Sequence, residues 1–318
     1  MIELGLRFFK WLRVVFFYAG LYIKDKLVAH QLASIQNNLH RIGRRDILLI
    51  SRLPNSSSNV EFFINYYRKI GVKHFIFVAM ADEEYSTFLI MQNDVSIWRV
   101  NRSKNSAFDV RWYNILLYRF GRERWSLIVE PDEYFVYPNM ATRSLAALGS
   151  FLDEERRRCV HTIVLDAYHD HAQKNAIPDE QQNPFVKFPM IDAGTYLQLP
   201  TKRHSIHIKG GPRLRTDFFE NPQKSPNLNR ITFVKWKRIF HFDATTQQAW
   251  PISLNRPHAL GKVSVSGALI SFNWIKSKLD QNPENIKLNS AFEEGVSTPY
   301  KSPEQLIDLG LICAGEWF

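Results

Sequence analysis

The sequence predicts an α/β protein with a mostly parallel sheet that is flanked by helices. Short apolar runs alternate along residues 46–170 with amphipathic segments of helical period, which is the pattern of strand, helix, strand units. The chain has 318 residues, 45% of them hydrophobic, which is enough for a large core and argues against disorder. We therefore expect one large folded domain at 46–312, preceded by a separate segment at 1–45 and followed by a tail at 313–318.

Each element is expected where its apolar pattern is bounded by a turn or a cap. Gly71 suits the end of a helix, and Ser302, Pro303, Gln305 and Gly310 form a start and a stop around a short late helix. Residues 172–230 are rich in Pro, Asn, Gln and Lys, so we expect substrate-facing loops or a mobile segment there. We expect strands at 46–51, 74–79, 95–100 and 125–130, with a further strand running from 161 into a polar loop; helices at 59–71, 109–121 and 141–158; and ordered structure again at 231–242 and 263–275.

The amino-terminal stretch at 7–26 is both aromatic and basic. Arg7, Lys10 and Arg13 recur every three residues and so share one side of a helix, and aromatic and aliphatic residues cover the rest. The longest charge-free run is about half of the ~20 residues that a bilayer span needs. We expect an amphipathic helix in the headgroup layer of an anionic membrane. An ordinary packed helix and a secretory signal or anchor are the alternatives.

The net charge of +10 is concentrated in two zones. Residues 1–45 carry eight Lys and Arg against two acids, and residues 201–240 carry ten against two. A local basic zone suits anionic lipid, a phosphate-bearing substrate or RNA, and solvated lysines are the plain alternative. RNA is the least favoured partner, because no RNA-binding module accompanies the alternation of basic and aromatic residues at 235–240. The two cysteines, Cys159 and Cys313, predict no disulfide framework, and a reducing compartment fits.

An acidic run follows the predicted strand at 125–130. In "SLIVEPDEYFVYP" (126–138), Glu130, Asp132 and Glu133 come directly before a second aromatic, strand-like stretch. Ligands of parallel α/β sheets bind at the carboxyl ends of the strands, so these carboxylates are candidates for a metal and phosphate site or a sugar site. An exposed turn is the alternative, since Pro followed by Asp often makes one.

Several stretches, in this order, resemble the family 2-like glycosyltransferases. They are "YYRKIGVKHFIFV" (66–78), "RWSLIVEPDEYFVYP" (124–138), "TIVLDAYHD" (162–170), "KGGPRLR" (209–215), "VSGALISFNWI" (265–275) and the helix expected at 303–309 with the "GL" that follows it. The resemblance covers most of residues 46–312. It implies a GT-A-like, Rossmann-type sheet that holds a nucleotide-sugar, with an acidic motif that binds a divalent ion on the donor diphosphate.

The resemblance implies a metal site and an acid for catalysis. Glu130 and Asp132 would bind Mn²⁺ or Mg²⁺, which stabilises the leaving diphosphate. Glu133 would have a catalytic role. Asp170 is our candidate for the base that deprotonates the acceptor hydroxyl.

Donor binding is expected to involve Asp82 and three basic residues. Lys209, Arg213 and Arg215 flank two glycines that let the backbone approach a ligand, and Arg forks suit a diphosphate. A plain turn with solvated arginines is the alternative for 209–215. His169 and His171 fit either a metal pair or general base, or ordinary loop positions.

The chain also departs from the family pattern. Glu130 replaces the usual Asp, Tyr67 stands at the place of a helical His, and 271–273 reads Ser-Phe-Asn where a His-Phe-Lys is expected. We expect a glycosyltransferase that acts on a saccharide or lipid-linked acceptor at the cytoplasmic face of the membrane, in surface polysaccharide or glycolipid assembly. An inactive glycosyltransferase-like binding module is the alternative, and a metal-dependent nuclease is less favoured.

Overall fold

The computed structural model describes most of the chain between residues 32 and 317. The described residues are 20, 23, 32–54, 59–80, 86–100, 111–170, 183–200, 206–236, 265–281 and 291–317. The amphipathic helix expected at 7–26 lies outside them, except that Gly20 and Ile23 are helical. No helix in this part of the chain combines the length and the apolar content needed to cross a bilayer.

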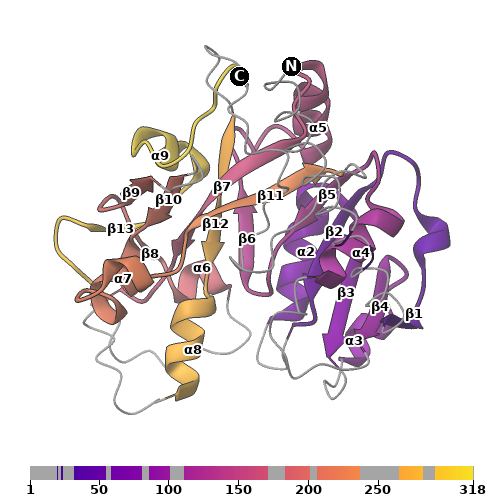
Figure 1. Cartoon of the computed structure of the whole chain (residues 1–318), viewed down its shortest axis with the longest axis horizontal. Coiled ribbons are helices and arrows are strands. Elements are labelled where there is room, and N and C mark those ends of the chain that lie inside the picture. Colours follow the sequence, from indigo (N-terminus) through magenta and orange to yellow (C-terminus); the bar gives the residue numbers. More distant parts are fainter. Residues whose placement is uncertain are drawn as a thin grey trace, which may run out of the picture.

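A nine-stranded sheet forms the centre of the molecule (Figure 1). Its order is β1-β4-β3-β2-β5-β11-β7-β12-β6. Strands β2, β3, β4, β5, β7 and β12 run in one direction, while β1, β11 and β6 run against them. The expected α/β class with a mostly parallel sheet is therefore confirmed. The strands are β1 (Leu32–Gln36), β2 (Ile47–Arg52), β3 (Val72–Met80), β4 (Val95–Val100), β5 (Trp125–Ile128), β6 (Glu133–Val136), β7 (Cys159–Asp166), β11 (Asn229–Lys235) and β12 (Ser266–Ser271).

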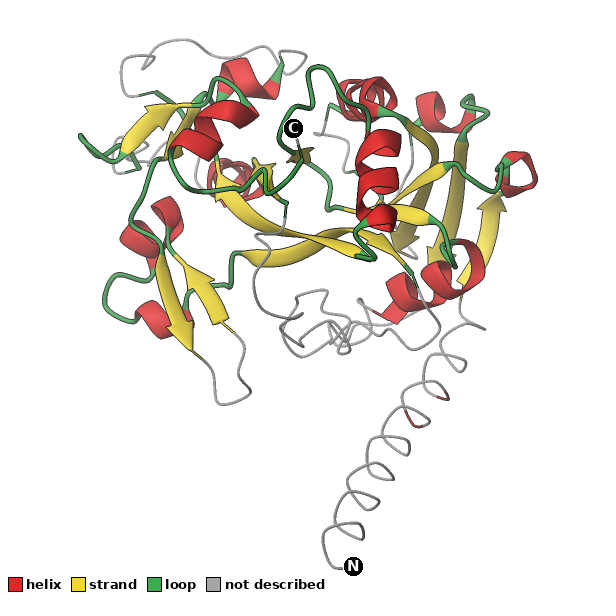
Figure 2. Cartoon of the chain, turned by 90° about the horizontal axis from the view of Figure 1, so that it is seen from above, coloured by secondary structure: helices red, strands yellow, loops and turns green. Residues whose placement is uncertain are grey.

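Helices cover both faces of this sheet (Figure 2). Phe63 and Leu148 anchor α2 and α5 in a large core on one face, and Trp112 and Leu116 anchor α4 in a second core on the other. Alternate residues of β2 enter the two cores, as a strand buried on both sides requires. The helices are η1 (Leu39–Arg41), α2 (Val60–Ile70), α3 (Thr87–Ile90), α4 (Arg111–Phe120), α5 (Leu145–Glu154), α6 (Pro184–Lys187), α7 (Gly211–Asp217), η4 (Pro222–Lys224), α8 (Asn273–Gln281) and α9 (Pro303–Asp308).

The expected caps at Gly71 and Ser302 form, together with a cap at Asn59 that was not predicted. Asn59 accepts a hydrogen bond from the backbone of Phe62 at the start of α2, and Gly71 ends that helix in the left-handed conformation with φ 113°. Ser302 caps α9 through the backbone of Gln305. The helix expected at 141–158 is shorter, because Ser144 caps it and it ends at Glu154.

The order of the strands reverses between β2 and β5. From β2 the chain adds β3 and then β4 on one side, and it returns to place β5 on the other side of β2. Such a reversal leaves a crevice between the carboxyl ends of the two central strands, because the connections leave them in opposite directions. Arg52 ends β2 at this point, and Glu130 follows β5.

The link from β5 to β6 is too short for a flat sheet. Three strands lie between β5 and β6 in the sheet order. In a flat sheet with the usual spacing, β5 and β6 would therefore be about 19 Å apart. Residues 130–133 form a tight turn, closed by a hydrogen bond from the backbone of Glu133 to that of Glu130, so the two strand ends lie within about 15 Å. The sheet must therefore twist and fold over itself at this edge, where β11 crosses it.

Residues 184–224 correct one expectation. The loops expected at 172–230 instead include α6, α7, η4 and most of a small second layer beside β7. Their short strands pair in two ribbons, so the abundance of Pro, Asn, Gln and Lys in this stretch was a poor guide to its structure. The strands are β8 (Met190–Asp192), β9 (Leu197–Pro200), β10 (Ile206–Lys209) and β13 (Ser297–Pro299).

Both ends of the described chain are packed into the molecule, Leu32 in the second core and Trp317 in the large core. The sheet begins at Leu32, ahead of the boundary that we placed at residue 46, because β1 pairs with β4. Trp317 of the expected tail is buried, and its indole N–H donates to the carbonyl of Pro138 at 2.9 Å. The folded domain thus includes residues from both segments that we expected to lie outside it.

We expect His74 to make folding sensitive to acid. Its ring is buried in β3 and lies 2.9 Å from the hydroxyl of Ser96, which also accepts a bond from the backbone of Asn38. Burial lowers the pKa of His74 from 6.5 to about 4. Its contribution to stability is therefore complete above pH 6.5 and is lost as the pH falls toward 4.

Between pH 7 and pH 4.5 the wild type should lose about 2 kcal/mol more unfolding free energy than His74→Gln, which keeps a polar group without the titration. Urea unfolding at both pH values measures this. Equal losses in the two proteins would contradict it.

Candidate functional site

The acidic run forms a turn whose second half is buried. Pro131 and Asp132 are its two central residues, and Asp132 has φ 61°, as the third position of a type II turn requires. Asp132 is 7% exposed and Glu133 is 1% exposed. The alternative of an exposed turn is therefore right about the turn, but two of its four residues, Asp132 and Glu133, are buried. We call residues 130–133 the acidic turn.

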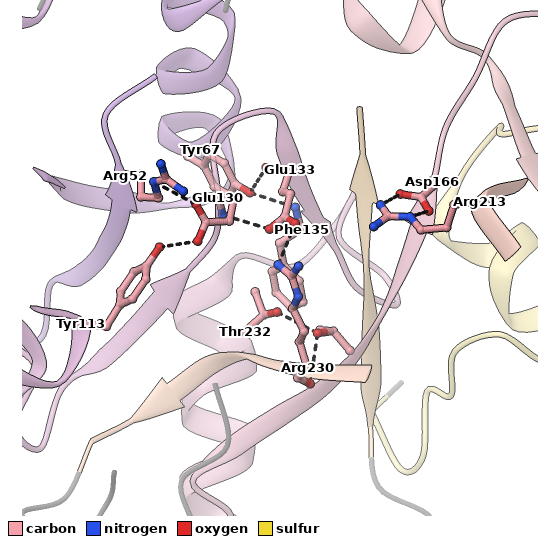
Figure 3. A network of polar contacts seen from close by, with 11 residues as sticks. Arg52, Tyr67, Tyr113, Glu130, Glu133, Phe135, Asp166, Arg213, Arg230 and Thr232 are labelled. Atoms are coloured by element: carbon pink, nitrogen blue, oxygen red, sulfur yellow. Dashed lines mark hydrogen bonds and ion pairs between the residues drawn. The ribbon is translucent and has the colours of Figure 1, made fainter. Parts of the chain in front are cut away.

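Glu133 holds the acidic turn to the rest of the sheet. One carboxylate oxygen accepts the backbone N–H of Glu130 at 2.9 Å, and the other accepts from Nη1 of Arg230 at 2.7 Å (Figure 3). The hydroxyl of Tyr67 donates to the carbonyl of Glu133 and accepts from the backbone of Phe135. The tyrosine at the place of the family histidine is thus an anchor for β6.

Glu130 lies at the reversal point between β2 and β5. The hydroxyl of Tyr113, from α4, donates to one carboxylate oxygen at 2.9 Å, and Nε of Arg52 lies 4.0 Å from the other (Figure 3). Burial, reinforced by the nearby charge of Glu133, raises the pKa of Glu130, while Arg52 and Arg230 oppose that rise. This end of the sheet therefore places two guanidinium groups around one carboxyl group.

Asp132 is bound by a lysine from the other side of the turn. Lys276, in the first part of α8, donates to its carboxylate at 2.6 Å, and the backbone of Phe272 donates to its carbonyl. Lys276 belongs to α8 and Phe272 directly precedes it, whereas Arg52 and Tyr113, the partners of the Glu130 carboxylate, belong to β2 and α4. In Figure 1, α8 and α4 lie on opposite sides of β6.

These contacts do not suit the metal site that the resemblance implies. A Mg²⁺ or Mn²⁺ ion needs several oxygen ligands that converge on it. Glu130, Asp132 and Glu133 instead each have a basic side chain beside the carboxylate. Among the residues that the structure describes, no group of three or more His, Cys, Asp or Glu is placed to hold an ion.

The three expected donor-binding basic residues contact the chain itself. Lys209 is buried, and its ammonium donates to the carbonyls of Ser225 and Gln223. Arg213 binds Asp166 with two parallel hydrogen bonds. Figure 3 shows this pair apart from the contacts of Glu133.

Arg215 is engaged in the same way. It binds Asp192 at 2.7 Å and Glu293 at 3.1 Å, and it also donates to the carbonyl of Ala291. The described contacts of the three basic residues thus tie the second layer to the sheet and to its neighbouring segments. Their binding of phosphate stays a prediction.

The placement of the remaining candidate residues, Asp170, His169, Asp82 and His171, says less about their roles. Asp170 is half-buried and lies beyond the carboxyl end of β7, at the same edge of the sheet as the acidic turn. The ring of His169 packs against that of Phe188, and burial with the charge of Lys187 lowers the pKa of His169. Asp82 and His171 lie outside the described residues.

Sequence reasoning missed four residues of the site. Arg52 and Arg230 could have been noticed, because the first ends a predicted strand and the second belongs to the basic zone at 201–240. Tyr113 and Lys276 carry no local signal, since each lies within an amphipathic helix. Their distances in the sequence from the carboxylates that they bind are 17 and 144 residues.

The comparisons with known proteins do not identify the chain. No protein-family model matches it, and no curated protein sequence matches it either. The likeness to family 2-like glycosyltransferases therefore stays a prediction.

Arg213 provides a test of the structural role of these basic residues. Asp166 is fully buried, so Arg213→Met leaves a charged carboxylate without its partner and should cost about 3–5 kcal/mol of unfolding free energy. Asp166→Asn combined with Arg213→Met should recover much of the loss, because it removes both charges.

Arg158→Met is the control, since its pair with Glu123 is exposed and should contribute less than about 1 kcal/mol. Chemical denaturation measures all three variants. An Arg213→Met protein as stable as the control would show that Arg213 does not hold the fold.

Proposed function

We propose that the protein is a glycosyltransferase whose nucleotide-sugar donor binds at the carboxyl ends of β2 and β5. The observation that supports this most directly is the reversal of strand order between these strands, with Arg52, Tyr113 and Glu130 at the resulting edge. Open α/β sheets bind their ligands at such a reversal. The run β4-β3-β2-β5 is the arrangement of a nucleotide-binding half-sheet, which agrees with the family resemblance in the sequence.

The groups at this edge suit a diphosphate and a sugar. Arg52 is 47% exposed on its side chain, so its guanidinium can bind an anion with two parallel hydrogen bonds. Arg230 adds a second positive charge near the carboxyl group of Glu130. Negative charge builds on the diphosphate as the glycosidic bond breaks, and fixed positive groups stabilise that charge.

Asp170 is the group that we propose as the base for the acceptor. It follows β7 at the same edge of the sheet, where an acceptor hydroxyl would have to meet the donor sugar. A saccharide or a lipid-linked saccharide is the proposed acceptor. The basic, aromatic segment at 7–26 would keep the enzyme at the cytoplasmic membrane surface.

One observation favours a binding module without catalysis as a second candidate. Both carboxylate oxygens of Glu133, the expected catalytic acid, are occupied by contacts that hold the turn. A module of this kind would bind nucleotide-sugar or saccharide without breaking the glycosidic bond. Release of nucleoside diphosphate from a nucleotide-sugar, in the presence of an acceptor mixture, separates the two candidates.

The donor site is tested by nucleotide binding to matched arginine variants. Nucleoside diphosphates should raise the melting temperature of the full chain, and Arg52→Ala should weaken their binding about tenfold or more, as expected for loss of a charged hydrogen bond. Thermal shift and calorimetric titration measure both effects.

The control is Arg158→Ala, which removes an Arg–Glu pair at the amino ends of the strands, on the opposite edge of the sheet. It should leave nucleotide affinity unchanged. If Arg52→Ala and Arg158→Ala bind equally well, or if no nucleoside diphosphate binds, the proposed donor site is wrong.

A further inference from the structure

We infer that the acidic turn uses basic side chains in place of a divalent ion, so that a diphosphate lying across the turn binds Arg52 and Arg230 on one side and Lys276 on the other. This inference rests on the proposed function, because it names how the same site would hold its anionic ligand. Each carboxylate of the turn is paired with one of these cations: Glu130 with Arg52, Glu133 with Arg230, and Asp132 with Lys276.

The charges at the turn balance without any ion. Three carboxylates face three cationic groups, so the cluster has no excess of negative charge with which to attract a divalent cation. An ion bound to Asp132 would also lie close to the ammonium of Lys276, which is 2.6 Å from the carboxylate. Repulsion between these like charges is strong where few water molecules screen it, and Asp132 is buried.

The cations have hydrogen-bond donors to spare. Arg52 approaches Glu130 only to 4.0 Å, beyond hydrogen-bond distance, and half of its side chain is exposed. The contact of Arg230 with Glu133 uses Nη1, and 29% of the Arg230 side chain is exposed. Lys276 has three N–H donors, and its contact with Asp132 uses one of them.

The carboxylates instead position these donors. Glu133 holds Arg230 and the backbone of the turn together, and Asp132 fixes the ammonium of Lys276 at the same turn. Long basic side chains lose entropy when a ligand immobilises them, so holding them in place beforehand favours binding. The acidic motif that suggests a metal site thus acts here as a support for basic groups.

Asp132→Asn distinguishes the two roles. If Asp132 binds a metal that carries the diphosphate, this variant loses diphosphate binding. If Asp132 only positions Lys276, the ammonium remains and the removed negative charge favours the anion, so binding is retained or becomes tighter. Asn also tolerates the left-handed backbone at this position.

The experiment titrates inorganic pyrophosphate into the full chain, by calorimetry and thermal shift, in EDTA and in MnCl₂. We expect equal affinity in both buffers for the wild type, unreduced affinity for Asp132→Asn, and a loss of about tenfold or more for Lys276→Met. Lys278→Met is the control on the same helix, because its pair with Asp217 lies outside the turn, and it should bind like the wild type.

Several results would overturn the inference. They are pyrophosphate binding that disappears in EDTA, a loss of binding in Asp132→Asn, equal binding by the two lysine variants, or no binding to the wild type at millimolar concentration. If Lys276→Met does not fold, Asp132→Asn combined with Lys276→Met removes both charges, and it should also lose binding. Metal-independent binding of pyrophosphate without binding of any nucleoside diphosphate would support the inference and reject the proposed donor site.

Discussion

The structure at the carboxyl edge of the sheet depends on the buried carboxylate of Glu133 and its contacts with the backbone of Glu130 and with Arg230. This carboxylate links three segments: the residues that follow β5, the start of β6, and β11, which lies between these strands in the sheet order. A turn of four residues can bridge β5 and β6 only because the sheet folds over here, and Arg230 reaches the turn from β11 at that fold. Because the contacts of Glu133 fix the turn, they also place Glu130 and Asp132 on its two sides.

Pairing of buried carboxylates recurs through the whole molecule. Asp166 with Arg213 and Asp192 with Arg215 tie the second layer to its surroundings in the same way that Arg230 ties the turn to β11. Removing such charges from water is costly, and the pairs repay that cost only with close geometry. Basic residues that look like ligands in the sequence are therefore in part the means by which this fold keeps its acids buried. The net positive charge is consequently a poor guide to where an anion binds.

Local signals predicted a large part of the fold. The strand at 95–100 and the helix that begins after Asn59 and ends at Gly71 agree with the sequence, because periodicity and capping residues act over a few positions. The place of β11 between β5 and β7 could not be predicted, since it depends on contacts with residues about 70 to 110 positions away. The same limit applies to the site. Glu130, Asp132 and Glu133 were found from their position after a strand, but the partners that decide their chemistry, above all Lys276, come from elsewhere in the chain.

A crystal structure of the protein with a nucleoside diphosphate, grown in EDTA, tests the central claim most directly. Our account predicts that the diphosphate lies at the carboxyl ends of β2 and β5, in contact with Arg52, Arg230 and Lys276. A nucleotide bound at another edge of the sheet would contradict the account. So would a diphosphate seen only when crystals contain Mn²⁺, with the ion bridging Glu130 and Asp132.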